Sequence, residues 1–139
     1  MQHVESLRKR YGETLLSLGS VNKDIVVLEA DLGKSTMSYL FQEAYPKRYF
    51  QMGIAEQNMA GVAAGLAMSG FNVYTYSIGN FPTLRCIEQI RNDIAYHHAN
   101  VKIVAVGGGY AYSDLGATHH ATEALGMMRT IPNIVISSP

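Results

Sequence analysis

Apolar residues along the chain follow two alternating patterns, one typical of amphipathic helices and the other of buried strands. Near the start, apolar positions three or four residues apart predict a helix over Glu5–Ser20. Its apolar stripe comprises Leu7, Tyr11, Leu15 and Leu18. The next run, Asp24–Ala30, is short and rich in β-branched residues, which predicts a strand buried on both faces.

The same criteria divide the rest of the chain into strands and helices in turn. Further helices are predicted at Thr36–Tyr45, Glu56–Ser69, Thr83–His98 and His119–Arg129. Further strands are predicted at Arg48–Met52, Asn72–Ile78, Val101–Val106 and Asn133–Ser137. Because strands alternate with helices, we expect an α/β fold of the doubly wound kind, with a mainly parallel sheet and helices on both faces.

The organisation of the chain indicates one domain. No repeat, low-complexity segment or linker divides it, so residues 1–139 are expected to form a single domain. A doubly wound domain usually adds a helix after a strand such as the last one predicted here. A chain that stops at Pro139 is therefore expected to be either truncated or short by nature.

Composition and charge narrow the class of protein. Hydrophobic residues make up 47% of the 139 residues and charged residues 16%, which is typical of a globular domain. Eleven basic residues balance eleven acidic ones, so no bulk field would attract nucleic acid or a membrane. The single cysteine, Cys86, and the lack of an apolar signal core favour a reducing, cytoplasmic location. Five histidines and one cysteine show no metal-ligand spacing, so we expect no protein-bound zinc.

Polar and conformationally special residues gather in the loops that follow the predicted strands. In parallel sheets of this kind, ligands bind at the carboxyl ends of the strands. The loops that qualify are Asp31–Ser35, Gly53–Gln57, Ile78–Thr83 and Gly107–His119. This placement follows from pattern alone, and any domain of this architecture would share it.

Four stretches of the chain together resemble one enzyme family. The segment Gly53–Ala67, with its Gly-Ile-Ala-Glu-Gln core, resembles the central motif of transketolases and deoxyxylulose-phosphate synthases. Glu29–Leu32, Phe81–Asn92 and Gly116–His120 agree with the same family in order and spacing. The likeness covers nearly the whole chain and is greatest to the pyrimidine-binding portion of split transketolases, which are made as two polypeptides. It implies a fold that binds thiamine diphosphate through its pyrimidine ring.

The resemblance assigns the central catalytic contribution to Glu56. In the family, the matching glutamate hydrogen-bonds a ring nitrogen of the cofactor's aminopyrimidine and so assists proton loss from the thiazolium carbon. A carboxyl group suits this because it can share a proton with a ring nitrogen of comparable basicity. Apolar neighbours would raise the pKa of this carboxyl group and the start of a helix would lower it, and the sequence leaves that balance open. The structural alternative is an ordinary carboxylate in the first turn of a helix.

Other site residues also come from the resemblance. Phe81 matches an aromatic residue that packs on the pyrimidine, and Asp31 matches a position in the cofactor-binding loop after the first strand. His119 matches a histidine that contacts the substrate near its carbonyl and hydroxyl oxygens, as an imidazole of near-neutral pKa can. Ser35 and Arg8 match positions that contact a substrate phosphate. Each also has a purely structural interpretation, as a core ring, a turn residue or a surface charge.

Some residues stay outside the predicted site, and two positions depart from the family. Arg85, Glu88 and Arg91 fit a solvated helix face equally well. The family commonly has Asp directly before the glycine of its Gly-x-Thr-His motif, whereas Leu115 stands here. A phosphate-contacting histidine of the family falls on Gly107. The sugar substrate and its phosphorylation are therefore left open.

The family's diphosphate- and magnesium-binding motif is absent from this sequence. No Gly-Asp-Gly segment followed by asparagines occurs, and no cluster of oxygen ligands suits magnesium. The resemblance therefore implies a partner chain that holds the diphosphate and magnesium, within a homo- or hetero-oligomer. The expected activity is ketol transfer between sugars or sugar phosphates. The alternatives are a deoxyxylulose-phosphate synthase, a 2-oxoacid dehydrogenase beta-type subunit, or a non-catalytic assembly remnant.

Overall fold

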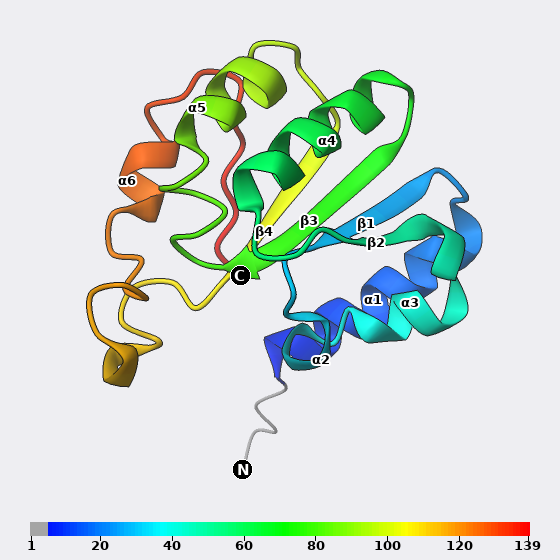
Figure 1. Ribbon diagram of the computed structural model, residues 1–139, viewed down its shortest axis with the longest axis horizontal. Coiled ribbons are helices and arrows are strands. Elements are labelled where there is room, and N and C mark those ends of the chain that lie inside the picture. Colours follow the sequence, from blue (N-terminus) through cyan, green and yellow to red (C-terminus); the bar gives the residue numbers. More distant parts are fainter. Residues whose placement is uncertain (1–5) are drawn as a thin grey trace.

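A parallel sheet of four strands forms the centre of the computed structural model, which describes residues 6–139 (Figure 1). The strands are β1 (Ile25–Glu29), β2 (Tyr49–Gln51), β3 (Asn72–Ile78) and β4 (Val101–Val106). Their order is β2-β1-β3-β4, and all three neighbouring pairs are parallel. The predicted strands at these four positions are confirmed.

Helices alternate with the strands along the chain. The α-helices are α1 (Leu7–Val21), α2 (Gly33–Thr36), α3 (Tyr39–Ala44), α4 (Glu56–Met68), α5 (Ile87–Gln89) and α6 (Ala124–Met128). Two short 3₁₀ helices, η1 (Pro46–Arg48) and η3 (Ser113–Leu115), and a π-helix, η2 (Ile90–Ala95), complete the set. The first residue of the predicted opening helix, Glu5, lies outside the described residues.

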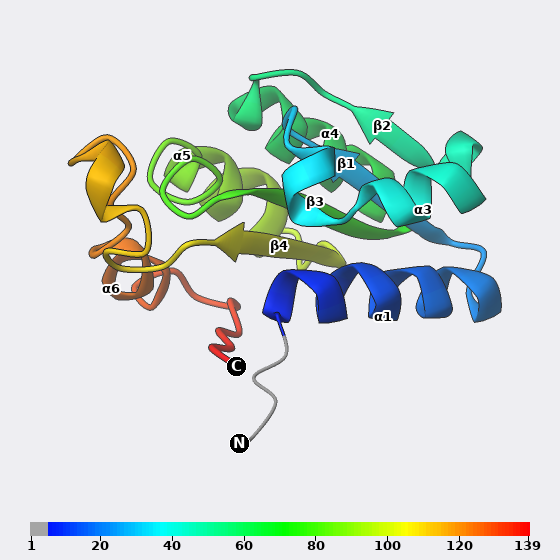
Figure 2. The same ribbon diagram turned by 90° about the horizontal axis from the view of Figure 1, so that it is seen from below.

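The two faces of the sheet are covered by different helices (Figures 1 and 2). All five residues of β1 are buried, and alternate ones point to opposite faces. Ile25 and Val27 pack with Leu15 of α1 and Phe41 of α3. The intervening Val26 and Leu28 pack with Met59 and Ala63 of α4. The predicted doubly wound α/β fold is therefore confirmed, and its continuous apolar strand is explained by burial on both sides.

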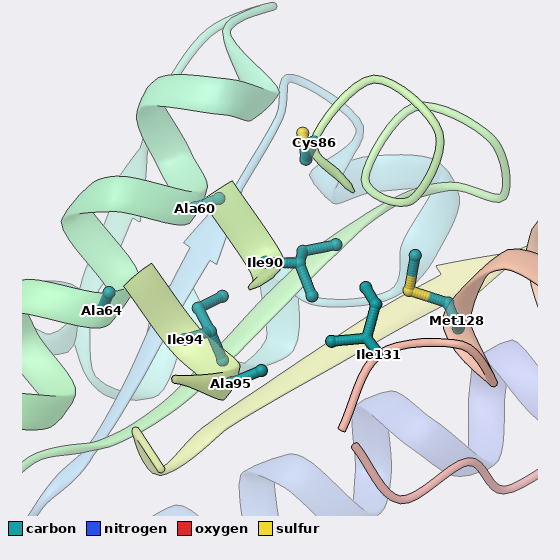
Figure 3. Packing of buried hydrophobic residues seen from close by; sticks show 8 residues of the cluster. All are labelled: Ala60, Ala64, Cys86, Ile90, Ile94, Ala95, Met128 and Ile131. Carbon is teal, nitrogen blue, oxygen red and sulfur yellow. The ribbon is translucent and has the colours of Figure 1, made fainter. Parts of the chain in front are cut away.

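A third cluster joins α4, η2 and the C-terminal segment (Figure 3). Its buried members are Ala60, Ala64, Cys86, Ile90, Ile94, Ala95, Met128 and Ile131. Small residues on α4 allow η2 to approach it closely. This cluster fixes the segment that follows β3, and that segment carries Phe81 and Arg85 toward the site described below.

Two of the predicted helices are shorter or broken. Met37 has a left-handed backbone with φ of 65° and follows the end of α2 at Thr36, so the helix predicted at Thr36–Tyr45 begins only with α3 at Tyr39. In the helix predicted at Thr83–His98, turns occupy the first residues, and regular hydrogen bonding begins only at Ile87.

The helix predicted at His119–Arg129 and the strand predicted at Asn133–Ser137 are also corrected. Ala121 exchanges both backbone hydrogen bonds with Gly109 in an antiparallel bridge, so these groups are not free for a helix, and α6 begins only at Ala124. Among the described residues, 133–137 form no strand: Asn133 has φ of 66°, and Val135 is almost fully exposed.

No helix within residues 6–139 combines the length and the apolar character that crossing a bilayer requires.

Candidate functional site

Glu56 is a buried carboxylate at the carboxyl edge of the sheet. The chain leaves β2, turns at Gly53 with φ of 69°, and enters α4, whose first residue is Glu56. Only 2% of Glu56 is exposed.

Arg85 is the main partner of this carboxylate. Its Nη1 donates to Oε2 of Glu56 at 2.9 Å, and the Ser77 hydroxyl lies 3.4 Å from Oε1. A charge-assisted bond of this length is much stronger than the long contact to Ser77. The sequence-based prediction of the site does not include Arg85. Its position four residues after Phe81, within the matched motif, is the signal that could have included it.

The same guanidinium connects Glu56 to Phe81 and so to His119. Its carbon lies 5.0 Å from the centroid of the Phe81 ring, within the range of a cation–π contact. The Phe81 ring meets the His119 ring with centroids 5.3 Å apart and planes inclined at 69°. Three predicted site residues, Glu56, Phe81 and His119, are thus brought together through Arg85.

Hydrogen bonds hold the two loops that carry these rings against each other. The Asn80 side chain donates to the carbonyl of Thr118 at 2.7 Å. The Thr118 hydroxyl lies 2.9 Å from Nδ1 of His119. The bridge between Gly109 and Ala121 closes the second loop at its base. His119 is therefore in a turn of a closed loop rather than at the start of a helix.

Cys86, the next residue after Arg85, is a buried free cysteine with an unreactive thiol. Burial, with a smaller contribution from the charge of Glu56, raises the pKa of its thiol to about 11. The thiol donates weakly to the carbonyl of Phe81 at 3.4 Å. A thiol with this pKa stays protonated near neutral pH, so Cys86 packs rather than reacts.

Arg8, Ser35 and Asp31 lie in a second group beside the first strand. Nη1 of Arg8 is 3.5 Å from the carbonyl of Ser35, at the limit of a hydrogen bond. Asp31 is exposed with φ of 60°, and its N–H donates to the Gln51 side chain at 2.7 Å. The two predicted phosphate contacts are thus neighbours. No contact among the described residues joins any of these three to Glu56, Phe81 or His119.

Tyr76 of β3 lies close to Arg8 of the second group and to Tyr112 of the closed loop. Burial, assisted by the charge of Glu29 and opposed by that of Arg8, raises the pKa of Tyr76 to about 12. Tyr112, from the closed loop, also acts on it. The Tyr112 ring fills the space where a side chain on Gly107 would extend, because a Cβ there would overlap the ring. A tyrosine thus stands beside the position where the family carries histidine.

Within residues 6–139, no three His, Cys, Asp or Glu side chains come together in a set that could hold a metal ion.

Comparison with known proteins identifies a family. The model for "Transketolase, pyrimidine binding domain" matches residues 5–139. A putative transketolase C-terminal section of Methanocaldococcus jannaschii is 46% identical over 97% of this chain and 43% of its own length. One subunit of an apulose-4-phosphate transketolase of Phocaeicola vulgatus is 41% identical over 95% of this chain and 42% of its own length. This chain therefore spans less than half the length of both relatives.

More distant and structural likenesses agree. A 1-deoxy-D-xylulose-5-phosphate synthase of Desulfotalea psychrophila is 36% identical over 93% of this chain and 20% of its own length. A solved structure described as a split-gene transketolase, an inactive beta4 tetramer, is 48% identical with a TM-score of 0.78, covering 91% of this chain and 40% of that one. The match over residues 5–139, together with these identities, shows that the chain belongs to the transketolase pyrimidine-binding domain family.

Proposed function

We propose that this chain is the pyrimidine-binding subunit of a transketolase-like enzyme that transfers a two-carbon ketol unit between sugars or sugar phosphates. The family implies thiamine diphosphate as the cofactor. The observation that carries the proposal is the Glu56 carboxylate, which is 2% exposed and lies at the edge of the sheet where ligands bind. It is linked through the Arg85 guanidinium to the ring of Phe81. Perturbed or buried carboxylates with a specific partner are concentrated at functional sites.

The side chains around Glu56 fit an aminopyrimidine. Glu56 would share a proton with a ring nitrogen through a hydrogen bond, and Phe81 would stack on the ring, contributing roughly 0.5–1.5 kcal/mol beyond burial. When bound, the cofactor supplies a carbon nucleophile and an electron sink for the ketol unit. Glu56 holds and moves the proton at the ring nitrogen, and its burial excludes water from that exchange.

The remaining residues suit the substrate side of the site. His119 touches Phe81 and would contact substrate oxygens as donor or acceptor. Arg8, whose Nη1 lies 3.5 Å from the carbonyl of Ser35, would bind an anionic group together with the Ser35 hydroxyl. Asp31 belongs to the cofactor-binding loop that follows β1. Tyr112, in place of a basic side chain at position 107, would leave this end of the site with a weaker hold on phosphate.

Activity is expected to require a partner chain that holds the diphosphate and magnesium. The described residues contain no suitable metal-binding set. The Methanocaldococcus relative is named a C-terminal section and the Phocaeicola relative a subunit, so both are parts of larger enzymes by their names. Turnover by the purified chain alone, with thiamine diphosphate and magnesium, would contradict this requirement.

The role of Glu56 is tested by the variant Glu56→Gln in the complex reconstituted with a diphosphate-binding chain. Glutamine keeps the size but cannot share a proton with the ring nitrogen. Hydrogen–deuterium exchange at the thiazolium carbon should slow by ~100- to 10,000-fold. The matched control is Glu88→Gln, an exposed carboxylate of α5. Wild-type exchange and cofactor affinity in Glu56→Gln would show that Glu56 is only structural.

A decarboxylating synthase is the second candidate, since a deoxyxylulose-phosphate synthase is 36% identical over 93% of this chain. The two candidates share the Glu56 chemistry and differ in the donor. Assay of the reconstituted complex with sugar-phosphate donors and, separately, with pyruvate distinguishes them. Release of carbon dioxide from pyruvate without ketol transfer would favour the synthase.

A further inference from the structure

The geometry points to Arg85 as a residue that occupies the pyrimidine position in the free chain and must leave it before the cofactor binds. This inference rests on the proposed function and concerns the same site. Arg85 is bonded to Oε2 of Glu56 at 2.9 Å and lies 5.0 Å from the centroid of Phe81. Those are the two groups that the aminopyrimidine would use.

A guanidinium group and a protonated aminopyrimidine are similar in shape and in hydrogen bonding. Both are flat, both can donate an N–H to a carboxylate from an edge, and both stack on aromatic faces. The Arg85 guanidinium makes both contacts at once, to the carboxylate of Glu56 and to the ring of Phe81. Two flat groups cannot fill that space together, so arginine and pyrimidine exclude each other.

The burial of the two partners shows which of them can move. Glu56 is 2% exposed and belongs to a 13-residue helix, so its carboxylate is fixed. The Arg85 side chain is 46% exposed and comes from the turns that precede α5, so it can swing into solvent. Its departure leaves the Glu56 carboxylate with only one hydrogen-bond partner among residues 6–139, the Ser77 hydroxyl at 3.4 Å. A buried carboxylate with so little support gains from a new donor, which the incoming ring provides.

Binding of the cofactor therefore exchanges the Arg85 guanidinium for the aminopyrimidine ring as the donor to Glu56. If Arg85 is in place about nine-tenths of the time, the apparent affinity for the ring falls about tenfold, because only the open fraction binds. Arg85 thereby keeps a buried charge satisfied until the cofactor arrives, at the expense of affinity. It is a positioning residue for Glu56 rather than a catalytic one.

The test measures binding of 4-amino-5-hydroxymethyl-2-methylpyrimidine to the purified chain by calorimetry or ligand-observed NMR. Arg85→Met keeps the apolar stem and removes every donor, and it should bind the probe about tenfold more tightly than wild type. Arg85→Lys keeps the charge without the flat group and should fall between them. The control is Arg91→Met, an exposed arginine whose Nη1 contacts the neighbouring Asn92 side chain at 3.2 Å.

A second measurement follows Arg85 itself. The guanidinium N–H signals of Arg85 should be protected from exchange in the free chain and lose protection when the probe is added. Glu56→Gln should release them without any probe. This readout reports the contact directly and does not depend on enzyme activity or on the stability of the Arg85 variants.

The outcomes separate this inference from the proposed function. Unchanged or weaker binding by Arg85→Met, with binding by wild type, overturns the inference alone and leaves the pyrimidine site intact. Arg85 signals that stay protected when the wild-type site is saturated overturn it as well. Lack of binding by both wild type and Arg85→Met contradicts the proposed function and the inference together.

Discussion

The Ser38 hydroxyl donates a 2.6 Å hydrogen bond to Oε2 of Glu29, and both residues are completely buried. The Thr36 hydroxyl supports the same oxygen at 3.4 Å. Oε1 of Glu29 and the hydroxyl of Tyr11 are buried without a hydrogen-bond partner among the described residues. Glu29 ends β1, so an ionisable group lies inside the core within two residues of Asp31.

Stability should therefore fall as the pH rises from about 4.5 to about 7. Burial raises the pKa of Glu29 from 4.5 to about 7, despite the hydrogen bonds from Ser38 and Thr36, which lower it. The folded protein holds a proton that the unfolded chain releases between these values, so this contribution is complete below about pH 4.5 and is lost above about pH 7. The loss is on the order of 3 kcal/mol.

Urea unfolding of wild type and Glu29→Gln across this pH range checks the prediction. Glutamine imitates the neutral acid, so the stability of the variant relative to wild type should increase with pH. Glu43→Gln, an exposed glutamate of α3, is the control and should show no such trend. A difference between wild type and Glu29→Gln that does not depend on pH would contradict the prediction.

Gly12 should tolerate no side chain. A Cβ at this position would lie 2.7 Å from the carbonyl oxygen of Met37 and 2.8 Å from its Cβ. Gly12→Ala should push α1 away from the turn between α2 and α3 and cost about 1–3 kcal/mol. Gly65→Ala, inside α4 with no atoms within 4 Å, should instead raise stability by about 0.5–1 kcal/mol. Equal urea midpoints for the two variants would rule out this contrast.

The chain is predicted to associate, with itself or a partner, through the Glu56–Ser69 segment and its Ala and Gly residues. Gly61 is exposed, and a Cβ there would meet nothing within 4 Å, so the backbone is open to close approach. Gly61→Arg should preserve the fold and should show a larger fraction of monomer than wild type in sedimentation velocity. Ser17→Arg, on the exposed side of α1, is the control. A wild type that stays monomeric at high concentration, with and without partner, would exclude the prediction.

Arg48 should be a structural residue on which the end of α1 depends. It donates to the carbonyls of Gly19 and Asn22 at 2.8 and 2.9 Å and lies 4.1 Å from the centroid of the Tyr45 ring. Arg48→Met removes both bonds and should lower the free energy of unfolding by about 1–3 kcal/mol. Arg48→Lys should recover part of the loss, because it keeps the charge. Thermal unfolding measures both, and a wild-type midpoint for Arg48→Met would refute the assignment.

The four strands of the sheet could be predicted because each is a short apolar run whose burial depends on local sequence. The positions at which predicted helices are interrupted or begin late could not be predicted. Met37 adopts its left-handed backbone where α1 and Gly12 pack against it, and Ala121 is held by its bridge to Gly109. These are contacts between segments far apart in the sequence, and they override helix propensity.

The candidate site could be predicted only in part for the same reason. Glu56, Phe81 and His119 are identified through a family motif, and the structure brings them together. The ion pair from Arg85 spans 29 positions of sequence and depends on how α4 meets the turns after β3. The buried pair of Ser38 and Glu29 likewise depends on the break at Met37, which turns Ser38 back toward the sheet.

The π-helix η2 changes the direction in which side chains point before and after it. Its wide turns are closed by bonds from the N–H of Tyr96 to the carbonyl of Arg91 and from Ala99 to Ile94, at 3.0 and 2.9 Å. An extra residue in a turn rotates everything after it by about 100° relative to an α-helix. Ile90 and Ala95, five residues apart, can therefore both face the core cluster of Figure 3. Deleting one residue from 91–93 would restore regular pitch and turn one of these two side chains away from that cluster.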